Sequence, residues 1–103
     1  MIRHLVALRY RDGTPAEVKQ GLMDELAGLS SWIDGILDFQ VRANVSVEDP
    51  LVRGLRDVFW FDFRDTGVRD VYLEDSVHQA IGARLVETLE GGIDGVYVFD
   101  FEV

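Results

Sequence analysis

Hydrophobic residues alternate with polar ones in four short segments of the chain and recur with a helical period in three others. Strict alternation is typical of a half-buried strand, and a spacing of three or four residues is typical of an amphipathic helix. The predicted strands cover residues 2–11, 36–43, 58–63 and 95–103. The predicted helices cover residues 14 to about 30, 66–73 and 76–90.

The alternation also predicts which side chains share a face of each strand, because successive side chains point to opposite sides. In the first strand His4 lies on the same face as Val6 and Leu8. In the second strand the apolar face is predicted to carry Leu37, Phe39 and Val41. The last two strands have apolar residues on both faces, which predicts that both faces become covered.

Two of the predicted helices begin with capping residues. Thr14 precedes Pro15 and stands three residues before Glu17, so Thr14 is predicted to be the N-cap of the first helix. Ser76, with Gln79 three residues later, is predicted to cap the last helix. The buried stripe of the first helix is predicted to contain Val18, Leu22, Leu26 and Leu29, with Met23 beside it.

The order of the main elements predicts an α+β, ferredoxin-like βαββαβ fold with an antiparallel sheet and helices on one face only. On the uncovered face we expect Leu5, Trp60, Tyr97, Phe99 and Phe101. A contiguous exposed aromatic surface normally marks an interface, and a two-fold homodimer is the simplest way to cover it. The alternative is a monomer whose C-terminal residues fold over the sheet.

Length, charge and composition restrict the class of protein. A chain of 103 residues accommodates one domain, covering residues 1–103. The formal charge of −9 argues against binding to nucleic acid and to an acidic membrane surface. The chain has no cysteine, which excludes thiolate catalysis. With no signal-peptide pattern and no apolar run of about 20 residues, we expect a cytoplasmic protein.

The stretch around His78 is the strongest candidate for chemistry. His78 falls in the first turn of a helix, where the helix dipole disfavours a positive charge, so a neutral imidazole is available as a general base. His78 shares a helical face with Ile81 and Leu85, and Tyr72 lies just before this helix. The alternative is a buried histidine bonded to a backbone carbonyl, with Tyr72 at the edge of the core.

His4 is expected to point into the same apolar space under the helices as His78 and Tyr72, which indicates a ligand site. Two histidines are also compatible with a metal, but no carboxylate is clearly placed to join them, so neither a metal nor a cofactor is predicted. Asp100 is either a buried acceptor that orients a partner or the exposed end of the last strand, and we expect the latter. No phosphate-binding glycine loop or hydrolase triad order is present.

Several short segments spread over the whole chain are informative when they are taken together. They are residues 2–10, residues 34–36 with Phe39 and residues 44–46, residues 63–65, Tyr72 with residues 78–80, and residues 98–101. In this order they resemble the stress-responsive A/B barrel (Dabb) domain family. The resemblance implies a ferredoxin-like subunit in a dimeric α+β barrel, which agrees with the expected uncovered face.

One plant branch of this family, the olivetolic acid cyclase type, closes a linear polyketide by an intramolecular aldol condensation. Its catalytic His and assisting Tyr match His78 and Tyr72, and a further His matches His4. The resemblance implies an apolar substrate pocket formed by Val6, Leu8, Leu22, Met23, Leu26, Phe39, Phe59, Phe61, Val96 and Val98.

The chain departs from the plant enzymes around this pocket, so the same substrate is not implied. Residues 75–77 replace the usual His-Pro before the small residue, and a third pocket histidine falls at Asp57. Leu22 and Met23 replace large aromatic residues, whereas Phe59 and Phe61 are bulkier here.

Three functions therefore remain open. The first is cofactor-independent cyclase or aldol-type chemistry on a polyketide-like carbonyl compound, with His78 as the base. The second is a non-catalytic stress-response module that binds a small hydrophobic ligand. The third is a monooxygenase of the dimeric α+β barrel type. The loop at residues 44–57 is a candidate lid or partner contact.

Overall fold

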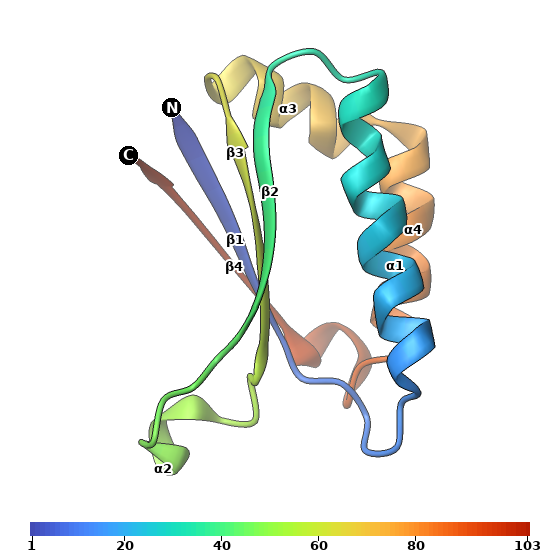
Figure 1. Ribbon diagram of the computed structural model, residues 1–103, viewed down its shortest axis with the longest axis vertical. Coiled ribbons are helices and arrows are strands. Elements are labelled where there is room, and N and C mark those ends of the chain that lie inside the picture. Colours follow the sequence, from blue (N-terminus) through green and yellow to red (C-terminus); the bar gives the residue numbers. More distant parts are fainter.

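Four strands form one antiparallel sheet in the order β2-β3-β1-β4 in the computed structural model, which describes residues 1–103. The strands are β1 (Ile2–Leu8), β2 (Ile36–Ala43), β3 (Asp57–Phe63) and β4 (Val96–Glu102). Three α-helices cover one face of this sheet and leave the other face open (Figure 1). This arrangement confirms the predicted α+β, ferredoxin-like fold.

The helices on the covered face are α1 (Ala16–Gly28), α3 (Thr66–Glu74) and α4 (Ser76–Glu87). Two short 3₁₀ turns, η1 (Leu29–Ser31) and η2 (Gly92–Gly95), follow α1 and α4. A further short helix, α2 (Asp49–Val52), lies in the connection between β2 and β3. None of the helices combines the length and the apolar composition that crossing a bilayer would require.

The core lies between the sheet and its helices and follows from the alternation of the strands. On β3, Phe59, Phe61 and Phe63 all point toward the helices and are buried. On β1, Val6 and Leu8 join them from the same face. These side chains pack against Leu26 and other buried residues of the helices, so the sheet and the helices share one hydrophobic cluster.

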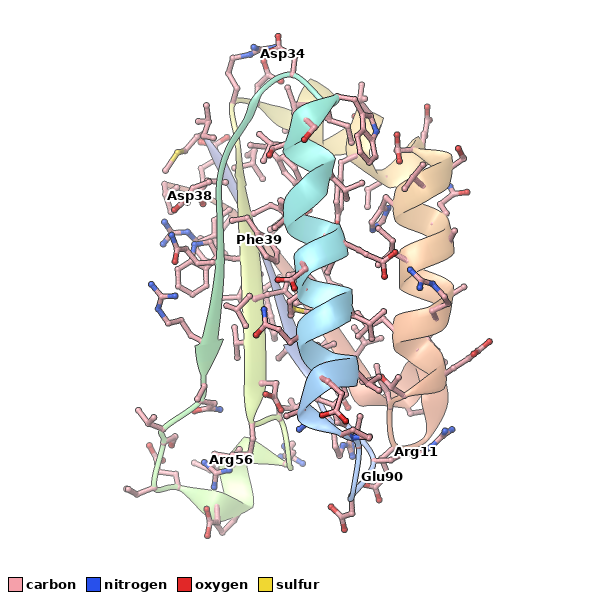
Figure 2. All side chains as sticks on the ribbon, turned by 45° about the vertical axis from the view of Figure 1, so that its right-hand side comes forward. Arg11, Asp34, Asp38, Phe39, Arg56 and Glu90 are labelled. Atoms are coloured by element: carbon pink, nitrogen blue, oxygen red, sulfur yellow. The ribbon has the colours of Figure 1, made fainter.

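The predicted facing of β2 was wrong at its start, because the strand contains a bulge. Ile36 pairs with Phe63 and Asp38 pairs with Asp62, so Leu37 is an extra residue in the ladder. The bulge gives the core position to Ile36, and Leu37 is 56% exposed. Beyond the bulge the predicted alternation holds, and Asp38 and Phe39 lie on opposite sides of β2 (Figure 2).

The predicted start of α1 was also wrong. Pro15 is the residue before the first helical residue, and the Thr14 hydroxyl donates a hydrogen bond to the Arg11 carbonyl instead of capping the helix. Val18 is 41% exposed, so the buried stripe begins at Leu22. The last helix ends at Glu87, three residues earlier than predicted. The first strand ends at Leu8, beyond which Tyr10 forms an isolated bridge with Leu89.

The open face of the sheet carries the five residues predicted for it. Tyr97, Phe99 and Phe101 are 44%, 53% and 43% exposed, and Leu5 and Trp60 are half-buried among them. Arg3 and Arg42 lie over the Trp60 ring at 5.3 and 5.6 Å from its centre. Arg3 also forms two hydrogen bonds with the Asp62 carboxylate. The face is therefore an aromatic surface flanked by charges of both signs.

Candidate functional site

A cavity of about 260 Å³ lies between the sheet and α4, with both histidines of the chain in its wall. Its polar lining residues are His4, Tyr72, His78 and Asp100. The remaining wall is largely apolar and consists of Val6, Phe59, Leu73, Gly82, Leu85, Val86, Val96 and Val98. Four functional groups that can exchange or share protons thus meet in an otherwise apolar space.

His4 is held by β1, one of the two inner strands of the sheet, and by a carboxylate from the strand beside it. The antiparallel register places His4 directly opposite Asp100 of β4. The His4 Nδ1 lies 2.6 Å from Asp100 Oδ1, and Arg69 of α3 donates a hydrogen bond of 3.1 Å to Asp100 Oδ2. A neutral imidazole in this arrangement donates its Nδ1–H to the carboxylate and keeps Nε2 free to accept.

Asp100 is exposed, as expected, but its carboxylate has contacts that an exposed strand end alone would not have. Asp100 bridges His4 and Arg69 and lines the cavity. Asp100 thus orients His4 as the alternative interpretation described, although it is not buried.

Tyr72 lies on α3 and is almost completely buried. Its ring packs against Phe61 and Phe63 of β3, with ring centres 4.8 and 5.0 Å apart. Burial raises the pKa of the Tyr72 phenol, and the negative charge of Asp100 raises it further. The phenol therefore remains protonated at physiological pH and is available as a hydrogen-bond donor.

His78 is positioned by the N-terminus of α4, and here the predicted cap was wrong by one residue. Asp75 is the N-cap, and its carboxylate accepts a hydrogen bond of 2.8 Å from the His78 backbone amide. The second Asp75 oxygen accepts a hydrogen bond from the Trp32 indole. Ser76 is the first helical residue, and the Gln79 amide donates to the Leu73 carbonyl instead of completing a capping box.

The environment of His78 favours a neutral imidazole. Burial lowers the pKa of His78, and the nearby His4 lowers it further. Asp75 and the Tyr72 carbonyl oppose this effect, but the net direction is downward. The His78 Nδ1 is buried without a hydrogen-bond partner, and the His78 and Tyr72 ring centres are 3.8 Å apart. A neutral imidazole and a protonated phenol thus lie in direct contact.

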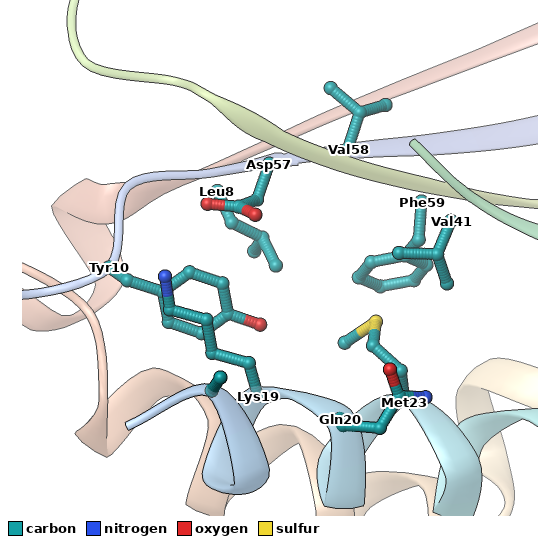
Figure 3. Close-up of a pocket in the computed structure, with 10 residues that line it drawn as sticks. Leu8, Tyr10, Lys19, Gln20, Met23, Val41, Asp57, Val58 and Phe59 are labelled. Atoms are coloured by element: carbon teal, nitrogen blue, oxygen red, sulfur yellow. The ribbon is translucent and has the colours of Figure 1, made fainter. Parts of the chain in front are cut away.

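A second, smaller cavity of about 160 Å³ lies toward the other end of the sheet, under the start of α1. Tyr10 and Lys19 lie at one end of this cavity, whereas Met23 and Val41 lie at the other (Figure 3). The Lys19 ammonium is 4.8 Å from the centre of the Tyr10 ring. Burial raises the pKa of Tyr10 to about 12, with a further contribution from the negative charge of Asp57.

Comparison with known protein families identifies the chain. The model of the stress responsive A/B barrel domain, Dabb, matches residues 2–103. The chain belongs to the Dabb family. This membership confirms the resemblance that the short segments indicated. No curated protein shows significant similarity to the sequence.

Solved structures similar to this Dabb chain include a dimeric ferredoxin-like protein of unknown function from Jannaschia sp. CCS1. It is 28% identical, with a TM-score of 0.87, and the match covers 99% of this chain and 98% of that one. A protein from Arabidopsis thaliana is 22% identical, with a TM-score of 0.86 and coverage of 100% and 95%. A hydroxynitrile lyase from Passiflora edulis is 10% identical, with a TM-score of 0.82 and coverage of 99% and 92%.

The apolar residues proposed for the Dabb pocket are distributed over three places. Val6, Phe59, Val96 and Val98 line the cavity beside the histidines. Leu8 and Met23 line the second cavity together with Phe59, which contributes to both. The four that line neither cavity are packed in the core: Leu22, Leu26, Phe39 and Phe61.

Sequence reasoning missed Leu73, Gly82 and Val86 in the wall of the histidine cavity. A helical signal for two of them was present, because Gly82 and Val86 follow His78 at intervals of four residues and therefore share its face. No group of three or more His, Cys, Asp or Glu side chains is arranged to hold a metal ion.

Proposed function

We propose that this Dabb protein is a cofactor-independent enzyme that transfers protons on a small, largely apolar carbonyl compound. The observation that carries this proposal is the meeting of two imidazoles, a phenol and a carboxylate in one cavity with apolar walls. Ligand sites typically combine an apolar wall with a few convergent polar groups. The cavity beside His78 is open, whereas a purely structural histidine would be expected against Phe59, Phe61 and Leu85 without a space.

In this mechanism His78 is the general base. A base must be unprotonated before the reaction, and burial together with His4 lowers the pKa of His78 and keeps it neutral. His78 removes a proton from the carbon next to the substrate carbonyl, which leaves an enolate. In an aldol-type closure the enolate carbon attacks a second carbonyl of the same molecule, and protonated His78 then returns its proton to the new alkoxide.

Tyr72 and His4 would act on the oxygen atoms of the substrate. The protonated Tyr72 phenol is suited to donate a hydrogen bond to the enolate oxygen as its negative charge develops. His4, with Nδ1 directed to Asp100, keeps Nε2 as an acceptor and would orient a hydroxyl group of the substrate. Asp100 and Arg69 are positioning residues for His4 in this proposal.

The cavity restricts the size and polarity of the substrate. A volume of about 260 Å³ lies below the range of about 300 to 1,000 Å³ that is typical of sites for drug-sized ligands. The valines and Phe59 in the wall favour an apolar substituent. A linear polyketide thioester with a short alkyl end has the spaced carbonyls that ring closure needs and fits these limits better than the long-tailed polyketides of plant cyclases.

The functional unit is proposed to be a homodimer joined through the open sheet face. The face carries Leu5, Trp60, Tyr97, Phe99 and Phe101, which a single chain leaves uncovered. The similar structure from Jannaschia is dimeric, which supports the same assembly here.

Turnover of linear polyketide thioesters with a short alkyl end by the purified protein tests the catalytic proposal. We expect His78→Ala to lower the rate by about 10²- to 10⁴-fold, as is usual when a general base is removed. Val77→Ala is the matched control, because Val77 is exposed and lies one residue away on the same helix. Equal rates for the two variants would exclude His78 as the base.

A non-catalytic ligand-binding module is the second candidate, and the largely apolar cavity wall favours it as well. This candidate predicts binding of an apolar fluorescent probe without turnover of any carbonyl compound. Because a hydroxynitrile lyase shares the fold, the substrate panel should also include cyanohydrins. Binding that survives in His78→Ala together with zero turnover by the wild-type protein would favour the module.

A further inference from the structure

The connection between β2 and β3, residues 44–56, projects beyond the sheet, and we call it the arm. Figure 1 shows α2, in the middle of the arm, on the side of the sheet opposite to α1 and α4. Arg56 marks the same projecting segment in Figure 2, again away from the helices. The arm therefore extends toward the side on which the open sheet face lies.

The arm is held in shape by its own hydrogen bonds. The backbone amide of Asn44 donates to the Arg56 carbonyl at 2.8 Å, and the Asn44 side chain donates to the Leu55 carbonyl at 3.0 Å. The Arg56 guanidinium donates to the Ser46 carbonyl at 2.7 Å and pairs with the Asp49 carboxylate. These contacts close the base of the arm and fix its path.

This ordered segment presents apolar side chains to solvent. Val45, Val47 and Leu51 are 86%, 92% and 66% exposed, whereas Val52 is buried and anchors the arm. Ordering a loop costs conformational entropy, and side chains that stay exposed in a single chain contribute no burial free energy to offset that cost. Several exposed apolar side chains on one pre-ordered projection are typical of a contact surface.

We propose that the arm is a second interface element, which packs Val45, Val47 and Leu51 against a second copy of this chain. This inference rests on the proposed dimer, because a copy that covers the open face occupies the side toward which the arm projects. The arm joins the sheet at the Asp57 end of β3, the same end of the open face at which Tyr97 lies. Arg56 pairs with Asp49, and the exposed Glu48 and Arg53 carry opposite charges, so the arm has no net charge that would repel a second copy.

A cysteine-free chain permits a direct test that leaves the rest of the arm intact. Val47→Cys carries an environment-sensitive fluorophore, and the matched control Ile93→Cys places the label on another exposed apolar residue, which is 75% exposed in η2 on the helix side. We expect emission from position 47 to shift to shorter wavelength as the protein concentration rises through the dimerisation range, with no shift at position 93. Identical behaviour of the two labels would overturn the proposal.

A second measurement separates the arm from the sheet face. Sedimentation equilibrium is expected to show at least about tenfold weaker dimerisation when Val45, Val47 and Leu51 are all changed to serine, and no change for Ile93→Ser. A monomeric wild-type protein would exclude the dimer itself and the arm contact with it. A triple variant that dimerises as tightly as the wild-type protein would exclude the arm contact alone. Should that variant fail to fold by circular dichroism, the label at position 47 decides.

Discussion

The two faces of the sheet are built from the same strands but meet different surroundings. On the covered face, Phe59, Phe61 and Phe63 of β3 are buried by the helices. On the open face, Phe99 and Phe101 of β4 are about half exposed. Successive side chains of each strand point to opposite sides, so the same strands supply the residues of both faces.

The polar pairs differ in the same way. Arg3 and His4 are neighbours in β1, and each pairs with an aspartate of an adjacent strand. Arg3 and Asp62 form a permanent ion pair on the open face, because a guanidinium stays charged at all physiological pH values. His4 and Asp100 form a hydrogen-bonded pair on the covered face, in the wall of the histidine cavity. This difference agrees with the proposal that the open face serves association and the covered face serves chemistry.

Truncation of one aromatic side chain on each face is expected to give the largest difference. Phe61→Ala leaves a cavity in the closed core and should lower the free energy of unfolding by about 3 to 5 kcal/mol. Phe99→Ala removes a side chain that is 53% exposed in the single chain, so it should weaken dimerisation and affect monomer stability far less. Urea unfolding at concentrations well below dimerisation measures this contrast. Comparable losses from both variants would mean that the open face is covered within one chain.

Removal of one carboxylate from each pair is expected to have the next largest effect. Asp100→Asn takes the orienting acceptor from His4 and should lower turnover by about 100-fold through misplacement of the imidazole. Asp62→Asn, on the other face, should leave kcat within a few fold. Proton NMR gives a readout independent of any substrate, because the Nδ1–H of His4 should produce a slowly exchanging downfield resonance. That resonance should vanish in Asp100→Asn and persist in Asp62→Asn.

The sequence allowed prediction of the fold because its signals are local. Alternation defined the strands and their buried faces, and the order of elements defined the ferredoxin-like arrangement. The prediction of which side chains face the core failed at Leu37. A single bulged residue inverts the alternation there, and the amino-acid composition does not reveal a bulge. The prediction of the helix N-cap failed at Ser76, because Asp75 is an equally good cap and only the backbone conformation decides between adjacent candidates.

The candidate site depends on contacts between segments that are distant in the chain. His4 and Asp100 meet only because β1 and β4, the first and last strands, pair in one particular register. A shift of that register by one residue would direct Asp100 to the other face. The sequence therefore indicated that His4, Tyr72 and His78 converge, but it could not assign Asp100 or Arg69 to them.

Two helical glycines permit a milder test of the covered face. A methyl group added at Gly82 or at Gly21 meets no atom within 4 Å, but only Gly82 lines the histidine cavity. Both glycine-to-alanine variants should raise the free energy of unfolding by about 0.5 to 1 kcal/mol, because alanine is the better helix former. Only Gly82→Ala should also weaken binding of an apolar probe. Thermal unfolding and probe titration measure the two effects. Equal binding of the probe to both variants would mean that the probe binds outside the histidine cavity.

The pH dependence of stability is expected to give the smallest effect and the most specific one. Burial and His4 lower the pKa of His78 in the folded chain below its ordinary value of 6.5. The unfolded chain therefore binds a proton at this residue before the folded chain does, so His78 makes stability fall as pH drops below 6.5. His78→Gln should remove that fall between pH 6.5 and the folded pKa, as measured by the midpoint of thermal unfolding. Asp75 contributes nothing in this range, because its pKa is also lowered and its effect on stability begins only near pH 4 and below. An unchanged slope in His78→Gln would mean that His78 is as freely protonated in the folded chain as in the unfolded one, and the covered face would then lack its neutral base.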